Sequence, residues 1–207
     1  MDFSYPVKTR TVAHSRGFTL VEMMVVVVII GLLAAIAVPQ IASRMRERRT
    51  SQAAQEVALL YRNARLRALG RGFAVMVRYD SGTGEFRVLE TLPTGGLTNC
   101  TPLLPPSCAN TDWAVASATR LVDKFNPSSA TSIYSGITVS VTPQAGGSAT
   151  SILDLCFTPR GRAFSRTVAA DALQPMTSVV DISVGQDSPM LQRHINVLPN
   201  GMARVAL

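Results

Sequence analysis

A run of 21 residues, from Phe18 to Val38, holds a single ionisable side chain, that of Glu22. At about 1.5 Å per residue, a helix of this length spans the roughly 30 Å hydrocarbon core of a bilayer. The sequence therefore predicts a transmembrane helix over residues 18–38. A carboxylate inside such a helix costs on the order of 2.5 to 3.5 kcal/mol on insertion scales, so we expect Glu22 to serve a function.

The residues at the start of this run form a recognisable motif. The sequence Gly17-Phe18-Thr19-Leu20-Val21-Glu22 follows a short basic segment and leads into the apolar run. It resembles the class III signal of type IV pilins and type II secretion pseudopilins. The resemblance implies that a prepilin peptidase cuts after Gly17, that the new amino terminus at Phe18 is methylated, and that the apolar run stays attached. Pro39 lies where many family members kink the helix.

The rest of the chain resembles the GspH/FimT group of minor pilins more loosely, mainly in its strand-rich C-terminal half. The resemblance implies an α+β, type IV pilin-like fold, in which a long N-terminal helix packs on an antiparallel β head domain. Residues 1–17 would be a cleaved leader, 18–71 a stem helix and 72–207 the head. Basic residues flank both ends of the apolar run, so the positive-inside rule does not set the orientation. The resemblance implies an inner-membrane anchor with a periplasmic head.

The resemblance also implies a function in assembly. The chain would be a minor pilin or pseudopilin that enters a filament through its N-terminal helix, where Glu22 pairs with the amino terminus of an adjacent subunit. The filament is the pseudopilus of a type II secretion system, or a type IV pilus that the chain primes or caps. The implied partners are the prepilin peptidase, other pilins or pseudopilins and an inner-membrane assembly platform. The sequence does not distinguish between the two systems.

Two other interpretations of the N-terminus compete with this one. An ordinary secretory signal would be cut after Ala35-Ile36-Ala37, but its apolar core is usually 7 to 15 residues long and lacks an acid such as Glu22. An uncleaved signal anchor explains the length of the run and leaves Gly17 and Glu22 without a purpose.

Beyond Pro39 the apolar residues keep a helical spacing as far as Gly70-Arg71-Gly72, where two glycines predict a helix end. The predicted helix of about 50 residues far exceeds the usual 11 or 12. After it the period shifts toward two, which predicts strands. The expected strands are residues 73–79, 85–92, 137–142, 152–158, 178–184, 194–198 and 202–207.

Three cysteines allow three pairings. Cys100 and Cys108 flank a short proline-rich loop, and a disulfide between them would add roughly 2 to 3 kcal/mol in an oxidising compartment. We expect that pairing, with Cys156 as a buried thiol in a strand.

The formal charge of +7 is concentrated in the stem. Residues 40–71 carry eight arginines against two acids, whereas residues 72–207 carry nine basic and nine acidic residues. A neutral head is not typical of nucleic-acid-binding domains. FimT-like pilins that bind DNA for natural transformation use a Gly-Arg-x-Arg segment, which the chain matches incompletely at Gly201-Met202-Ala203-Arg204. Arg160 and Arg162 in a second basic turn complete the alternative DNA site.

Catalysis has little support in the sequence. His194 is the single histidine after the leader, and its strand-like surroundings favour a structural position over a general base. CxxC, HExxH and nucleophile-elbow patterns are absent from the sequence. We expect no enzyme, no catalytic residue, no cofactor and no metal site.

Overall fold

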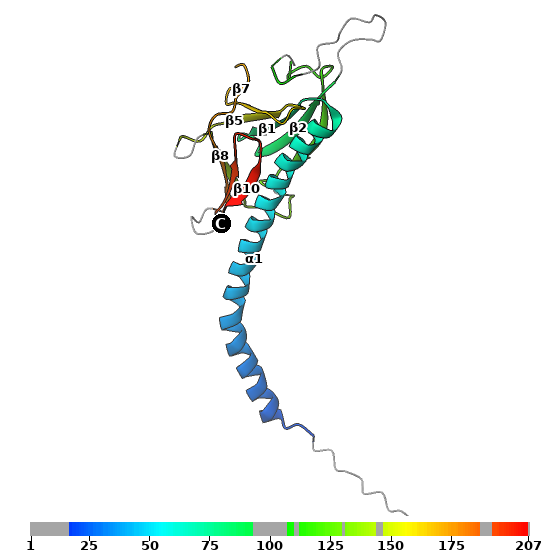
Figure 1. The fold of residues 1–207 in the computed structure, drawn as a ribbon. Helices are drawn as coiled ribbons and strands as arrows, with labels where there is room; N and C mark the ends of the chain where they lie inside the picture. Colours follow the sequence, from blue (N-terminus) through cyan, green and yellow to red (C-terminus); the bar gives the residue numbers. More distant parts are fainter. Residues whose placement is uncertain are drawn as a thin grey trace, which may run out of the picture. The chain divides into compact units, whose positions relative to one another are not determined.

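The computed structural model describes residues 17–92, 107–109, 112–129, 131–143, 147–186 and 192–206. The chain forms two compact units, Met1–Arg44 and Met45–Leu207. Helix α1 (Leu20–Arg71) is 52 residues long and contributes to both units (Figure 1). It confirms the predicted long helix and its end near residues 70–72. The predicted leader, apart from Gly17, lies outside the described residues.

Both ends of α1 follow from local chemistry. The Thr19 hydroxyl accepts a hydrogen bond from the Glu22 N–H at 3.2 Å, and the Thr19 carbonyl accepts one from the Met23 N–H at 3.2 Å. Thr19 is therefore the N-cap of the helix. At the other end Gly72 has φ of 75° and donates its N–H to the Ala68 carbonyl, a conformation that glycine adopts without strain. The helix continues through Pro39, and the kink at that residue stays a prediction.

The helical part of the first unit is apolar and exposed. An 18-residue window of α1 has a mean hydropathy of 2.9, and none of it is buried. Its length and composition suffice to cross a membrane, although a signal sequence near the N-terminus has the same properties. The side chains from Phe18 to Val38 are all exposed in the isolated chain.

The described strands form two antiparallel sheets. The six-stranded sheet has the order β3-β2-β1-β5-β6-β7, and the four-stranded sheet the order β10-β9-β8-β4. The first contains β1 (Val75–Asp80), β2 (Glu85–Thr91), β3 (Thr119–Phe125), β5 (Ile152–Phe157), β6 (Ala163–Arg166) and β7 (Gln174–Pro175). The second contains β4 (Thr138–Thr142), β8 (Val180–Gly185), β9 (Arg193–Val197) and β10 (Ala203–Ala206).

The seven predicted strands correspond to β1, β2, β4, β5, β8, β9 and β10, and the α+β fold class is confirmed. The prediction missed β3, β6 and β7. Strand β3 lies at an edge of its sheet and leaves Leu121 52% exposed, so it lacks a clear alternation of buried and exposed residues. Strands β6 and β7 have four and two residues, too few to show a period.

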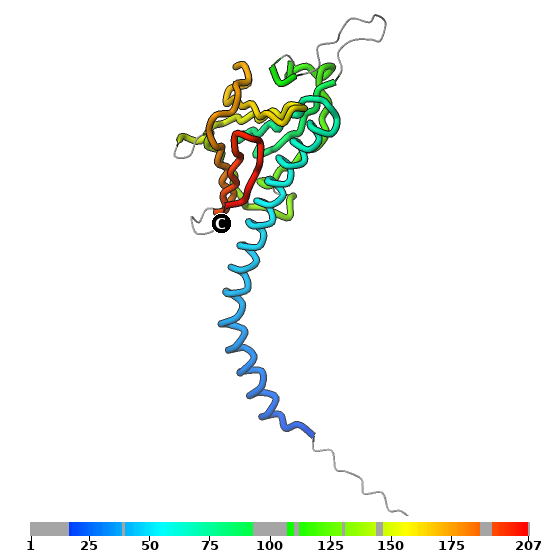
Figure 2. Tube along the Cα trace, in the orientation of Figure 1, coloured from blue at the N-terminus to red at the C-terminus, as the bar shows by residue number. Residues whose placement is uncertain are grey.

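The C-terminal half of α1 forms one wall of the main core. Its buried side chains are mostly small, at spacings of three and four residues, which lets the strands approach the helix closely. They are Ala53, Ala54, Val57, Ala58, Leu60, Tyr61, Ala64 and Ala68. Figure 2 shows the β9–β10 hairpin, in red, beside this half of the helix. The compact unit accordingly begins at Met45, well before residue 72, where the sequence placed the start of the head.

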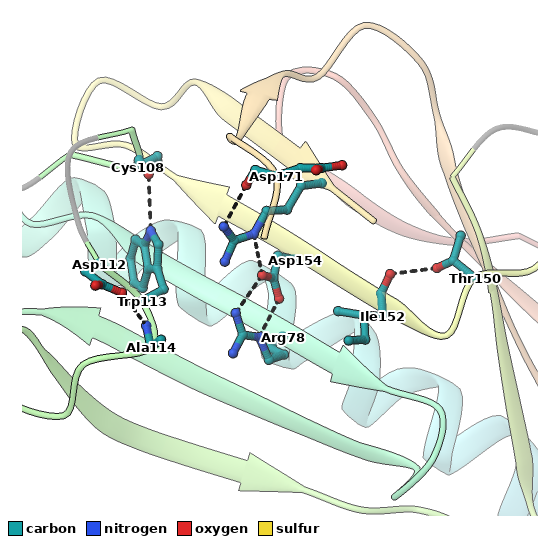
Figure 3. Close-up of polar contacts among 10 residues, drawn as sticks. Arg78, Cys108, Asp112, Trp113, Ala114, Thr150, Ile152, Asp154 and Asp171 are labelled. Carbon is teal, nitrogen blue, oxygen red and sulfur yellow. Dashed lines mark hydrogen bonds and ion pairs between the residues drawn. The ribbon is translucent and has the colours of Figure 1, made fainter. Parts of the chain in front are cut away.

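A second, smaller core lies on the other face of the six-stranded sheet. Along β5, Leu155 and Phe157 belong to the main core, whereas Cys156 between them packs with Trp113 and Met76 in the smaller core. There Cys156 forms a disulfide with Cys108. The Trp113 Nε1–H donates to the Cys108 carbonyl at 3.1 Å (Figure 3).

The predicted Cys100–Cys108 bond is therefore wrong for this structure, and Cys156 is buried as predicted but is not a free thiol. The prediction weighed only closeness in sequence. Because side chains alternate along β5, Cys156 points to the face of the sheet that the segment containing Cys108 covers. This brings together two residues 48 positions apart in the sequence. Cys100 lies outside the described residues.

Candidate functional site

The predicted cleavage junction is accessible. Gly17 and Phe18 precede the first helical residue and are exposed, Phe18 to 76%. A side chain added at Gly17 would contact nothing within 4 Å, and Gly17 has no positive φ. Within the part of the chain that the structure describes, neither the packing nor the backbone requires a glycine at this position.

Glu22 occupies the first turn of α1, directly after the Thr19 cap. A carboxylate at this position interacts favourably with the helix dipole, and the spacing Thr19-x-x-Glu22 is that of a capping box. The carboxylate makes no ion pair with any described residue of the chain, and the side chain is exposed. The structure thus brings Glu22 within one helical turn of Phe18 and leaves its charge available. Sequence reasoning missed the role of Thr19, although the Thr-x-x-Glu pattern signals it.

Residues 13–38 match a family model described as the prokaryotic N-terminal methylation motif. The chain carries a prepilin-type methylation motif. This motif contains Gly17, Phe18 and Glu22, and it ends one residue before Pro39.

Known proteins similar to this motif-bearing chain include pilins. A fimbrial protein of Pseudomonas aeruginosa is 37% identical over 82 residues, which are 36% of this chain and 53% of that protein. The type IV major pilin protein PilA of Myxococcus xanthus is 47% identical over 48 residues, 23% of this chain and 22% of PilA. The chain thus spans about half, or less, of the length of these relatives.

Two solved structures are similar to the chain at low sequence identity. The type IV minor pilin FimU of Pseudomonas aeruginosa is 14% identical, with a TM-score of 0.45, over 76% of this chain and 87% of FimU. The minor pseudopilin EpsH from the type 2 secretion system of Vibrio cholerae is 11% identical, with a TM-score of 0.47, over 76% of this chain and 94% of EpsH.

A buried carboxylate on β2 holds the end of α1 to the six-stranded sheet. Glu90 is 1% exposed and binds Arg67 of the helix at 2.9 Å and Arg120 of β3 at 2.6 Å, with Arg71 at 3.5 Å. Burial alone would raise the pKa of Glu90, but the hydrogen bonds from Arg120 and Arg67 lower it below its usual value. Arg67 and Arg71, two of the eight arginines of the stem, therefore bind an acid within the chain.

A second buried carboxylate joins three neighbouring strands. Asp154 on β5 is fully buried and receives hydrogen bonds from Arg78 of β1 at 2.7 and 2.8 Å and from Arg166 of β6 at 2.7 Å (Figure 3). Arg166 also donates to the Asp171 carbonyl at 2.8 Å. This Asp154 cluster consists of charges that neutralise each other inside the unit, so its arginines are not available to a ligand.

The three residues of the predicted DNA site lie on different elements of the fold. Arg160 and Arg162 are exposed in the turn between β5 and β6, which adjoins α1 at Leu69. Arg204 is exposed on β10, where its neighbour Ala203 is buried toward the helix. Because side chains alternate along a strand, Arg204 points to the outer face of the four-stranded sheet.

His194 lies on β9, exposed, with its Nδ1 3.0 Å from the Asp181 carboxylate. No group of three His, Cys, Asp or Glu side chains able to hold a metal ion occurs in the part of the chain that the structure describes.

Proposed function

We propose that the chain is a minor pilin or pseudopilin that is cut after Gly17, methylated at Phe18 and assembled through α1 into a filament. The observation that carries the proposal is the coincidence of the methylation motif at residues 13–38 with an exposed junction and an exposed apolar helix. In assembly, Glu22 pairs with the amino terminus of a neighbouring subunit, because two charges that are separately costly in lipid offset each other when they meet.

The proposed filament is either the pseudopilus of a type II secretion system or a type IV pilus that the chain primes or caps. The proposed partners are a prepilin peptidase, other pilins or pseudopilins and an inner-membrane assembly platform. The head lies in the periplasm in this scheme. The neighbouring genes discriminate between the two systems, since each has its own secretin and assembly ATPase.

The mature chain is expected to begin with N-methylated Phe18. Intact-mass measurement and N-terminal sequencing of protein extracted from membranes test this expectation. The variant Gly17→Trp should keep the leader, because a bulky side chain at the junction obstructs the peptidase while open space around Gly17 leaves the fold undisturbed. A wild-type chain starting at Val38 would instead indicate a secretory signal and contradict the proposal.

Replacing Glu22 by glutamine should abolish most incorporation into filaments and leave membrane insertion intact. The amide keeps the size of the side chain but removes the charge that pairs with the neighbouring amino terminus, and insertion becomes easier without a carboxylate. Sheared filaments and membranes, probed by immunoblot, separate the two outcomes. The matched variant Glu47→Gln, on the same helix, should assemble normally because Glu47 is paired with Arg193 on the head. Equal incorporation of Glu22→Gln and wild type would exclude an assembly role for Glu22.

A further inference from the structure

Among the half-buried arginines that the structure describes, Arg65 is the one that binds no carboxylate. The other four each bind a carboxylate, and they are Arg67, Arg78, Arg166 and Arg193. Arg65 makes no ion pair with a described residue, and its Nε is buried without a hydrogen-bond partner among them. Leaving a buried donor unpaired costs free energy. Arg65 therefore has donors that no described residue of the chain uses.

Two turns of the same design pack against Arg65. Residues 158–162 read TPRGR and residues 198–202 read LPNGM, and the glycine of each has φ of 77°. In both turns the first residue's N–H donates to the last residue's carbonyl at 2.9 Å. A side chain at Gly201 would lie 3.1 Å from Arg65 Cδ, and one at Gly161 would lie 3.7 Å from Arg65 Nη2. Glycine at position 201 keeps room for the arginine, whereas a side chain at Gly161 would make an ordinary van der Waals contact with it.

Arg65 lines a groove between α1 and the β9–β10 hairpin. The groove holds about 200 Å³ and is lined by Arg62, Arg65, Leu66, Gly201, Met202 and Ala203. The Arg62 Nε–H donates to the Ala203 carbonyl at 2.9 Å, which fixes a second guanidinium at the edge of β10. Leu66 and Met202 are 62% and 40% exposed and form an apolar rim. Sites for small molecules usually hold at least about 300 Å³, so this groove suits a single side chain.

Resting on the proposed function, we propose that this groove is a docking site for a carboxylate side chain of a different filament subunit. Arginine in a partly desolvated groove with apolar neighbours is typical of the residues that dominate protein–protein binding. Its planar guanidinium can hold a carboxylate through two parallel hydrogen bonds. An exposed leucine and methionine at the rim suit a protein surface better than a phosphate backbone.

The proposed function argues for a different subunit as the partner. A minor pilin that primes or caps a filament has other subunits as its neighbours, and five of the chain's own acids are already held in ion pairs within the described part: Glu47, Glu85, Glu90, Asp154 and Asp181. The expected partner therefore presents an exposed aspartate or glutamate next to an apolar residue that covers Leu66.

A photo-crosslinking side chain, benzoylphenylalanine, placed at Leu66 of the full chain in its native membranes tests the proposal. Mass spectrometry should identify a product with another pilin-like subunit, joined close to an aspartate or glutamate. Arg65→Glu should lower the yield of this product at least about tenfold, because a charge of the wrong sign then faces the partner's acid. The matched variant Arg204→Glu, on the outer face of β10, should change the yield less than about twofold.

Four further controls keep a negative result interpretable. Arg65→Met removes the charge but keeps an apolar stem, and retention of the Cys108–Cys156 disulfide shows that the head of each variant has folded. Changing the partner's acid to arginine should restore the product in the Arg65→Glu chain. The same crosslinker at Val28 reports on assembly through the apolar helix.

Loss of products at both Leu66 and Val28 in the wild-type sequence would contradict the proposed function itself. Products at Val28 without any at Leu66, or a Leu66 product unchanged by Arg65→Glu, would overturn the docking site alone. Products only with DNA, lipid or a second copy of this chain would overturn it as well.

Discussion

The Asp154→Ala variant is expected to lose about 3 to 5 kcal/mol of its free energy of unfolding, enough to unfold many small domains. The carboxylate is fully buried, and its removal leaves Arg78 and Arg166 as uncompensated charges whose side chains are 22% and 12% exposed. Urea denaturation of a soluble fragment beginning at Met45, the first residue of the compact unit, gives the measurement.

Two further variants separate charge pairing from other causes of this loss. Asp181→Ala removes a carboxylate whose partner His194 is 47% exposed, and it should cost at most about 1 kcal/mol. Replacing Asp154, Arg78 and Arg166 together by leucine and two methionines should recover most of the stability, because no buried charge then remains in the Asp154 cluster. A loss below about 1 kcal/mol in Asp154→Ala would mean that water reaches the two arginines.

Removing the disulfide by Cys108→Ala with Cys156→Ala is expected to destabilise the compact unit by about 4 kcal/mol. The bond joins residues 48 positions apart and restricts the unfolded chain accordingly. The same measurement on wild-type protein with and without a reducing agent provides the control, since both should show a similar loss.

Peptide mapping under non-reducing conditions checks the pairing directly. A peptide containing Cys108 should be linked to one containing Cys156, and Cys100 should react with an alkylating agent. A Cys100–Cys108 link would contradict the structure and would also predict a smaller loss of stability on reduction, because the closed loop is shorter.

Much of the fold was predictable from the sequence because its signals are local. Each of these signals depends on neighbouring residues in the sequence: the length of the apolar run, the glycine at position 72 that ends the helix, and the alternation of side chains in β1 and β5. The disulfide was not predictable in this way, since the pairing depends on which face of β5 Cys156 occupies and on what covers that face. The missed strand β3 shows the same limit, because an edge strand with an exposed Leu121 gives no clear period.

The same distinction applies to the candidate functional residues: some form a local motif, and others meet only in the folded chain. Gly17, Phe18 and Glu22 lie within six residues and form a motif, whereas the surroundings of Arg65 come from a helix and two distant turns. Each turn can be predicted by itself from its proline and glycine. Their convergence on one arginine is a property of the tertiary structure. The acid that holds Arg67 and Arg71 of the helix likewise comes from a strand, so counting charges along the stem overstated how many were free.

The contribution of α1 to the core of the head sets an order for folding as the chain is synthesised. The Arg62 side chain binds the Ala203 carbonyl, 141 residues later, and β10 closes the sheet beside the helix. A nascent chain that has emerged only as far as β8 lacks these contacts and leaves part of the alanine face of α1 uncovered. Because contacts between such distant residues form slowly, the head is completed only after the strand at Ala203–Ala206 has emerged. An unfinished subunit therefore lacks the surface that the last hairpin and the helix form together.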